Sequence, residues 1–316
     1  MIILSFISAF LLSACLTWII IKISAIIPLK QFVRKEGPNF HLQTKTNIPA
    51  FGGLAIIAAV LFASFIFIDV DIHTHLISLP FLLVGYTAIG LLDDGIKIFR
   101  KDNLGLSASQ KFILQILVSV IFSFIIIMNS VDLGVQGFLK AAGFGFWPLY
   151  LFLSVFITAG LSNAANLTDG LDGLLSGCAS IAFLSFAFIA LKLHNSPIAI
   201  FCFIFAGALL GFLVFNFNPA KIFMGDVGSL PIGAALAAVA LFLHQELNFI
   251  IICGVLVVET LSVMLQVAWY KKFKTRIFKM SPLHHHFELS GFKEKQIVFA
   301  AYSISIICGI IGYVLA

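Results

Sequence analysis

Charged residues are scarce in this sequence of 316 residues: Asp, Glu, Lys and Arg make up 10%, whereas hydrophobic residues make up 61%. Soluble domains carry about 25% charged and about 45–50% apolar residues. The chain therefore lacks the polar surface that a water-exposed globule needs, and its mean hydropathy of +1.11 indicates a protein embedded in lipid. This composition excludes large extramembrane domains, disorder and a fibrous repeat.

Cysteine is also sparse, and its placement excludes a zinc or redox motif. The five cysteines lie inside apolar runs, at positions 15, 178, 202, 253 and 308. We expect them to be small buried hydrophobic residues. The first 29 residues contain an apolar stretch too long for a signal peptide and without a small-residue cleavage pattern, which predicts a retained first helix.

Apolar runs separated by polar breaks predict an all-α integral membrane protein with about ten transmembrane helices, forming one domain over residues 1–316. The expected helices are 2–28, 48–68, 76–92, 112–128, 146–162, 174–193, 198–215, 230–243, 249–270 and 296–316. Seventeen of the 19 Lys and Arg residues fall on one side of this arrangement. That side is predicted to be cytoplasmic and both termini extracytoplasmic. The basic surface then faces anionic lipid and requires no nucleic acid.

Five aspartates gather at three of the cytoplasmic connections. They are Asp93, Asp94, Asp169, Asp172 and Asp226. A carboxylate beside a lipid-embedded helix is costly and therefore suggests function by default. The alternative, that loop acids only solvate helix ends, is reasonable for one aspartate and poor for all five.

The segment LLDDGIK places Lys97 four residues after Asp93, on the same face if the helix continues. Adjacent aspartates point in different directions, so one of Asp93 and Asp94 can serve a metal while the other handles a proton or orients Lys97. Lys111 can offer a point charge to phosphate. Taken alone, it is better explained as an interfacial anchor of its helix.

In the segment NAANLTDGLDGLLSG, Asn166 or Thr168 is a candidate cap of a helix that starts there, with Asp169 and Asp172 on one face of its first turn. Helix capping alone would also explain these acids. The closely spaced glycines favour a site instead, because they let a ligand or another backbone approach.

In FNFNPAKIFMGDVGSLPIG, glycines flank Asp226, and the nearby backbone N–H groups are expected to face a phosphate. Phe223 suits stacking on a nucleobase; the alternative is insertion into the bilayer interface. The segment thus combines an acid, an anion site and an aromatic ring.

The last cytoplasmic connection contains SPLHHHFELSGF. Consecutive His284, His285 and His286 cannot all bind one ion from a regular helix, so zinc is not favoured and a place beside phosphate oxygens is expected. Glu259 lies within a span, two turns before Gln266 on the same face, and should face the bundle interior. Oxygen ligands without metal-spaced Cys or His favour Mg²⁺. Together, these groups predict phosphoryl transfer.

Four ordered segments, LLDDGIK, NLTDGLDGL, FNFNPAKIFMGDVGSL and SPLHHHFE, closely resemble the polyprenyl-phosphate N-acetylhexosamine-1-phosphate transferase superfamily. They are most similar to its branch with a MurNAc-pentapeptide donor, and the resemblance covers nearly the whole chain. It implies a Mg²⁺-dependent enzyme of the bacterial cytoplasmic (inner) membrane. Its reaction would move phospho-MurNAc-pentapeptide from UDP-MurNAc-pentapeptide to undecaprenyl phosphate, giving lipid I for peptidoglycan and releasing UMP. The oligomeric state stays open, with a homodimer as one alternative.

The resemblance also implies catalytic roles. Asp226 corresponds to the Mg²⁺ ligand, and Asp93 and Asp94 to catalytic acids, one of which would deprotonate the lipid phosphate. Covalent attack by an aspartate on the diphosphate is the alternative. The triplet His284, His285 and His286 is the signature of the MurNAc-pentapeptide branch.

Substrate contacts are implied in the same way. Contacts with phosphates or the nucleotide sugar correspond to Lys45, Lys97 and Lys111. The nucleoside side of the pocket corresponds to Asn166, Asp169, Asp172, Asn216 and Phe223, with Phe223 stacked on uracil. Glu259 and Gln266 would lie close to a groove for the lipid.

One segment departs from the superfamily pattern. Where the branch has Lys-x-Gly-Thr-Pro-Thr-Met-Gly-Gly, this chain has KTNIPAFGG, so that Ile48 and Ala50 replace the two threonines. The version here resembles the IPxxGG of relatives that transfer GlcNAc-phosphate, which makes UDP-GlcNAc the alternative donor; HHHFE favours MurNAc-pentapeptide. A transporter is a remote alternative, because its acids should line a route through the bilayer, whereas these crowd one face.

Overall fold

The computed structural model describes residues 1–26, 48–68, 77–100, 104–129 and 146–316. The elements of these ranges are helices, and seven of them are long and apolar enough to cross a membrane. These seven are α1 (Ile2–Ile26), α4 (Ser78–Arg100), α5 (Ala108–Asn129), α7 (Phe146–Thr168), α8 (Leu174–Lys192), α9 (Ser196–Asn216) and α14 (Glu294–Leu315). The described ranges therefore agree with the prediction of an all-helical integral membrane protein.

The remaining helices are shorter or less apolar. Two short apolar helices are α3 (Gly52–Phe67) and α10 (Asp226–Phe242). The helix expected over 249–270 is divided into α11 (Phe249–Ile252) and α12 (Gly254–Phe273), and α13 (Leu283–Glu288) follows. Each of the ten expected apolar runs thus contains a helix, although not each of these helices is long and apolar enough to span a membrane.

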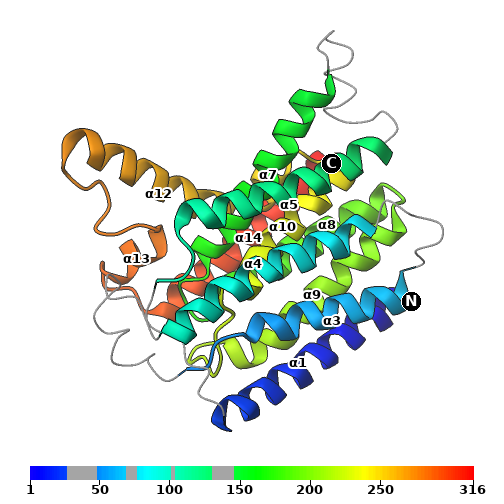
Figure 1. The fold of residues 1–316 in the computed structure, drawn as a ribbon, viewed down its shortest axis with the longest axis horizontal. Helices are drawn as coiled ribbons and strands as arrows, with labels where there is room; N and C mark the ends of the chain where they lie inside the picture. The colour runs from blue at the N-terminus through cyan, green and yellow to red at the C-terminus, as the bar shows by residue number, and fades with distance from the viewer. Residues whose placement is uncertain (27–47, 69–76, 101–103, 130–145) are drawn as a thin grey trace.

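Helix α10 is the central helix, with every residue from Asp226 to Leu241 buried. It contacts α3, α4, α7, α8 and α9 (Figure 1). Small residues let lipid-embedded helices approach closely, and α10 is rich in Gly and Ala. Because α10 begins at Asp226, this packing places an acid in the middle of one end of the bundle.

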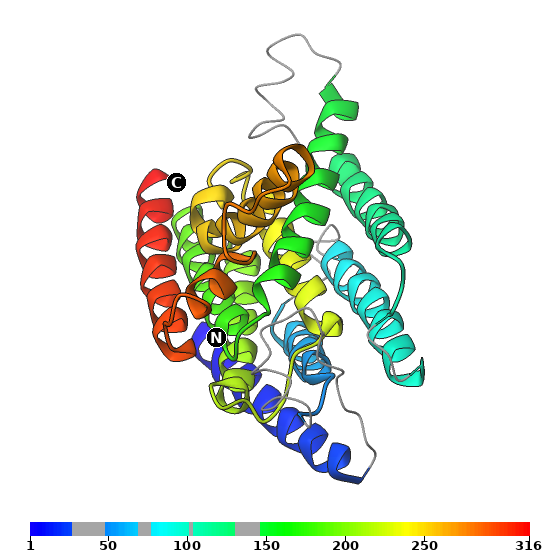
Figure 2. The ribbon, with the colours of Figure 1, turned by 90° about the vertical axis from the view of Figure 1, so that its left-hand side faces the viewer.

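The two ends of the bundle differ. Both chain termini lie at one end, and α13 lies at the other, where α12 projects away from the remaining helices (Figure 1). Figure 2 shows this second end facing the viewer, with α12 and α13 in front. The polar segments after α7 and α9 are joined there by hydrogen bonds, and α13, which follows α12, packs against the first of them.

Two of the predicted boundaries differ most from the structure. Helix α4 does not stop at residue 92, where the apolar run ends, but continues to Arg100. Lys97 thereby lies within the helix and pairs with both Asp93 and Asp94. Helix α7 runs to Thr168, whose hydroxyl donates to the carbonyl oxygen of Ala164 at 2.8 Å. Thr168 and Asn166 therefore end a helix rather than begin one.

The acids after α7 consequently lie in a turn, residues 169–173, and not in the first turn of a helix. Helix α8 begins at Leu174, and Gly173 before it has a left-handed backbone with φ 80°. Glycine adopts this conformation without the cost that a Cβ imposes. The glycines that suggested close approach of a ligand thus also end α7 and separate it from α8.

Candidate active site

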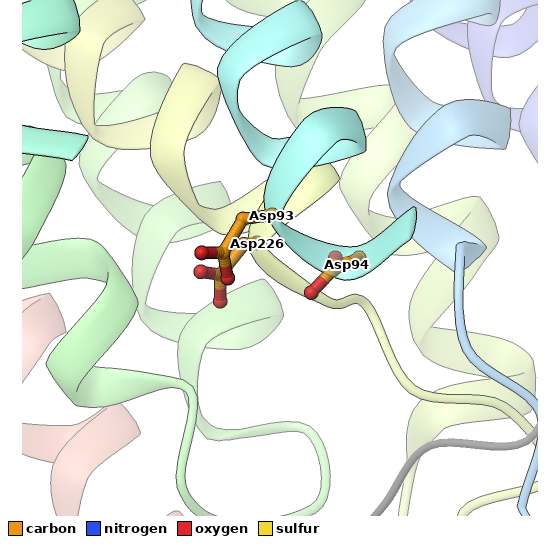
Figure 3. Close-up of side chains that lie close together, drawn as sticks. All are labelled: Asp93, Asp94 and Asp226. Carbon is orange, nitrogen blue, oxygen red and sulfur yellow. The ribbon is translucent and has the colours of Figure 1, made fainter. Parts of the chain in front are cut away.

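Three aspartates from two helices meet at the end of the bundle that holds α13. Asp93 and Asp94 come from α4, and Asp226 begins α10; their exposed fractions are 1%, 4% and 8%. One carboxylate oxygen from each lies within 4.8 Å of the others. In Figure 3 the carboxylates of Asp93 and Asp226 lie side by side, and that of Asp94 lies further along the same end of α4. We call these three residues the aspartate cluster.

Two lysines bridge the aspartate cluster. The Nζ atom of Lys97 lies 2.5 Å from Asp93, 3.1 Å from Asp94 and 3.5 Å from Asp226. The Nζ atom of Lys111 lies 2.5 Å from Asp226 and 3.1 Å from Asp93. Lys97 thus shares the face of Asp93 as its spacing predicted, and Lys111 is directed at the acids, which a simple interfacial anchor would not require.

Each aspartate also accepts a hydrogen bond that fixes its orientation. Backbone N–H groups of Leu106 and Val227 donate to Asp93 at 2.8 Å and to Asp94 at 3.1 Å. The side-chain amide of Asn166 donates to Asp226 at 2.8 Å. The carboxylates are therefore held by the segment just before α5, by α7 and by the start of α10, which are distant in sequence.

Ser229 is a buried member of this site that the sequence did not single out. Its hydroxyl oxygen accepts from the amide of Asn166 at 2.9 Å. A small polar residue within the apolar run of α10 was the available signal. The backbone donor of Leu106 left no comparable signal, because any residue type supplies an N–H group.

The N–H groups at the start of α10 do not point freely towards a ligand as expected. That of Val227 donates to Asp94, and those of Gly228 and Ser229 donate to the carbonyl oxygen of Gly225. This helix start is used to hold an aspartate, so the predicted phosphate site on these three groups is wrong.

The IPAFGG segment braces the loop before Asp226. Phe223 donates its N–H to the carbonyl oxygen of Pro49 at 2.8 Å and accepts one from Gly52 at 2.9 Å. Gly53 packs on Gly228 so closely that a Cβ would overlap that backbone.

The residues that depart from the superfamily pattern lie in the same segment. Ala50, which replaces a threonine, is buried against Val227. Ile48 comes just before the residues that pair with the loop. Lys45 lies outside the described residues. The departing segment thus supports the aspartate cluster through its backbone.

Two predicted nucleoside contacts are engaged within the protein. Oδ2 of Asp172 accepts the N–H of Ala220 at 3.0 Å. Asn216 accepts the N–H of Gly173 at 3.1 Å and donates to the carbonyl oxygen of Ile222 at 3.0 Å. Both side chains therefore join the 169–173 turn to the loop over residues 217–225. Asp169, in the turn, and Phe223, in the loop, are both partly exposed.

The three histidines point to different partners. His284 is buried, with Nδ1 3.2 Å from Glu259 and its ring against Gly170. His285 lies 2.7 Å from Glu288. The Nδ1 atom of His286 accepts the N–H of Lys279 at 3.1 Å. The rings are thus directed to separate groups, and His284 connects α12 with the 169–173 turn.

Gln266 holds the segment between α12 and α13. Its side-chain oxygen accepts the N–H groups of Ile277 and Phe278 at 3.0 and 3.1 Å, and its amide donates to the carbonyl oxygen of Phe278. Glu259, on the same face, is buried beside His284. The expected inward face of this helix is present, and these two residues use it to hold the histidine segment.

Similar proteins give these residues a context. Residues 76–244 match a family described as "Glycosyl transferase family 4". A "Phospho-N-acetylmuramoyl-pentapeptide-transferase" of Staphylococcus epidermidis is 46% identical over 288 residues, 89% of each chain. Proteins of the same name are 44% identical in Bacillus cytotoxicus, over 96% of this chain and 94% of the relative, and 41% identical in a Geobacillus species, over 98% and 96%.

Proposed function

Because this chain belongs to glycosyl transferase family 4 and, within it, to the phospho-N-acetylmuramoyl-pentapeptide-transferases, we propose how its aspartate cluster serves their reaction. The chain transfers phospho-MurNAc-pentapeptide and forms lipid I. UDP-MurNAc-pentapeptide is the proposed donor, undecaprenyl phosphate the acceptor and UMP the second product. The GlcNAc-phosphate alternative suggested by IPAFGG is set aside, since the relatives carry the MurNAc-pentapeptide name.

One observation carries the catalytic proposal: a buried group of three carboxylates is bridged by two lysines at the end of the bundle. Phosphoryl transfer depends mainly on positioning and on neutralising phosphate charge. Lys97 and Lys111 would neutralise the donor diphosphate. Of the fixed carboxylates, one would hold the cation, and another beside it would accept a proton.

The aspartate cluster fits Mg²⁺, which prefers oxygen ligands and one or two carboxylates together with substrate phosphates. Three carboxylate oxygens within 4.8 Å of one another meet that preference, and Asp226 is the proposed ligand. When bound, Mg²⁺ would polarise the diphosphate and stabilise the charge that develops on it.

Asp93 and Asp94 are the proposed proton acceptors. An oxygen of the acceptor phosphate attacks the donor phosphorus attached to the sugar, its proton passes to one of these carboxylates, and the bond to UMP breaks. Asp93 is held by the N–H of Leu106 and by Lys97, so its carboxylate has a fixed direction. Such positioning is what a general base requires.

The donor's nucleoside is proposed to bind beside the 169–173 turn and the loop over residues 217–225. Asp169 and Phe223 are partly exposed there and are the proposed direct contacts, with Phe223 stacked on uracil. Asp172 and Asn216 would act indirectly, by holding the turn and the loop together. Lys45 is proposed as a further phosphate contact.

The histidine segment is proposed to complete the donor site. His284 would support the 169–173 turn, whereas His285 and His286 are partly exposed and would face the donor. Glu259 and Gln266 of α12 would keep the histidine segment in place. These two residues would lie beside the proposed lipid groove.

The proposed setting is the bacterial cytoplasmic membrane, crossed about ten times, with the aspartate cluster on the cytoplasmic face and both termini outside. The basic connections predicted from the sequence support this orientation. The two marked termini both lie on the side away from α13 (Figure 1). A cytoplasmic donor would thus reach the aspartate cluster directly, and a lipid acceptor would reach it from the bilayer.

A donor comparison tests this function. Purified protein in detergent with Mg²⁺ and undecaprenyl phosphate should release UMP from UDP-MurNAc-pentapeptide and form lipid I. The same reaction with UDP-GlcNAc is the matched control and should release little. Release from UDP-GlcNAc alone would overturn the assignment of the donor.

A further inference from the structure

The first residue of α14, Glu294, reaches the turn between α7 and α8. Its Oε1 atom accepts the N–H of Asp172 at 2.7 Å, and its Oε2 atom accepts the amide of Asn218 at 2.8 Å. The amide of Asn218 also donates to Oδ2 of Asp172 at 3.1 Å. One carboxylate thus ties together the 169–173 turn, the loop over residues 217–225 and α14.

A second residue of α14 contacts the same turn. Tyr302 lies eight residues further along the helix, on the same side, and donates its hydroxyl to the carbonyl oxygen of Gly173 at 2.6 Å. His284 of α13 lies against Gly170. The C-terminal part of the chain therefore contacts the turn at Gly170, Asp172 and Gly173, which are spread over its length.

A simpler explanation is that Glu294 only stabilises its own helix. An acid in the first turn favours a helix through the helix dipole, and Glu294 is the acid in the first turn of α14. That explanation requires a negative charge at this position but no particular side-chain length. The two hydrogen bonds need a side chain long enough to meet Asp172 and Asn218 together, so side-chain length separates the explanations.

We infer that Glu294 is a positioning residue for donor binding: it fixes the turn that presents Asp169 to the nucleotide. The inference rests on the proposed function, because that function places the nucleoside beside the turn. Glu294 itself need not touch the substrate. Its loss would therefore weaken binding of the donor and leave the aspartate cluster unchanged.

Kinetics with UDP-MurNAc-pentapeptide test the inference. Glu294→Ala should raise the donor KM about tenfold, because two hydrogen bonds to a charged group are lost, and should change kcat less than about threefold. Glu294→Asp keeps the charge but is one methylene shorter, so its KM should also rise. Ser303→Ala, a change of an exposed neighbour on α14, is the control and should leave KM unchanged.

Tyr302→Phe gives an independent measurement, because it removes only the bond to Gly173 and should raise KM about threefold. If Glu294→Ala does not fold in detergent, Glu294→Asp decides the question, because a KM equal to that of the wild type would overturn the inference. An unchanged KM in folded Glu294→Ala, or full recovery in Glu294→Asp, would overturn the inference. A wild-type protein that released no UMP would instead overturn the proposed function, and calorimetric binding of UMP to the variants would still report on Glu294.

Discussion

Replacing Lys111 by methionine would remove the ammonium group between Asp93 and Asp226 while keeping a side chain of similar length. The Nζ atom lies 2.5 Å from Asp226 and 3.1 Å from Asp93, and both carboxylates are largely shielded from water. The three carboxylates and two lysines carry a formal charge of −1, and the change makes it −2. We therefore expect Lys111→Met to bind Mg²⁺ more tightly, even though it transfers phosphate more slowly.

The magnitude follows from the charges. At a distance of about 5 Å from the ion and an effective dielectric constant of about 20, the loss of one positive charge makes the interaction energy with a divalent ion more favourable by about 7 kcal/mol. Desolvation opposes much of this gain. We expect a net gain of at least about 1.4 kcal/mol, or tenfold in the dissociation constant. Without metal, losing one partner of a buried ion pair costs about 3–5 kcal/mol of stability.

Calorimetric titration with Mg²⁺, together with the Tm in EDTA and in Mg²⁺, measures both effects. The Tm of Lys111→Met should fall in EDTA and should recover in Mg²⁺ by more than that of the wild type. Lys271→Met, at an exposed site in the last turn of α12, is the control and should change neither quantity. Equal or weaker Mg²⁺ binding by Lys111→Met would refute the reasoning.

Three further changes probe the same site. Gly53→Ala should lower the Tm and the rate of UMP release, because the new Cβ would overlap the backbone of Gly228, whereas Gly95→Ala has open space and should change neither. Asn166→Leu removes the amide that orients Asp226, so kcat/KM for UMP release should fall about tenfold; an unchanged value would contradict this role. Removing Mg²⁺ with EDTA should stop UMP release, and added Mg²⁺ should restore it; persistent release in EDTA would argue against a metal-dependent site.

Much of the aspartate cluster could be predicted because its signals are local. The spacing of Asp93 and Lys97 gave their pairing, since residues four apart share one face of a helix. Acids beside apolar runs stood out because they are costly in lipid. The membrane setting followed from composition, and the all-helical class from the length and spacing of the apolar runs.

Other parts depend on tertiary contacts that a local pattern does not contain. Asn166 has the side chain of a helix cap, yet α7 continues past it, and its amide serves Asp226 instead. The start of α10 resembled an anion site, but its N–H of Val227 binds Asp94. The link from Glu294 to Asp172 joins segments 122 residues apart. Such pairings depend on how helices pack, which the spacing of residues along the chain leaves open.

The central claim is that the aspartate cluster is the Mg²⁺-dependent centre of phospho-MurNAc-pentapeptide transfer. The most direct measurement compares UMP release by Asp226→Asn with that by Glu246→Gln. Glu246 is another buried acid, which follows the opposite end of α10 and accepts a hydrogen bond from Tyr150. Asp226→Asn should lose about a hundredfold or more in kcat, while Glu246→Gln should keep activity within about threefold. Full activity in folded Asp226→Asn would contradict the account.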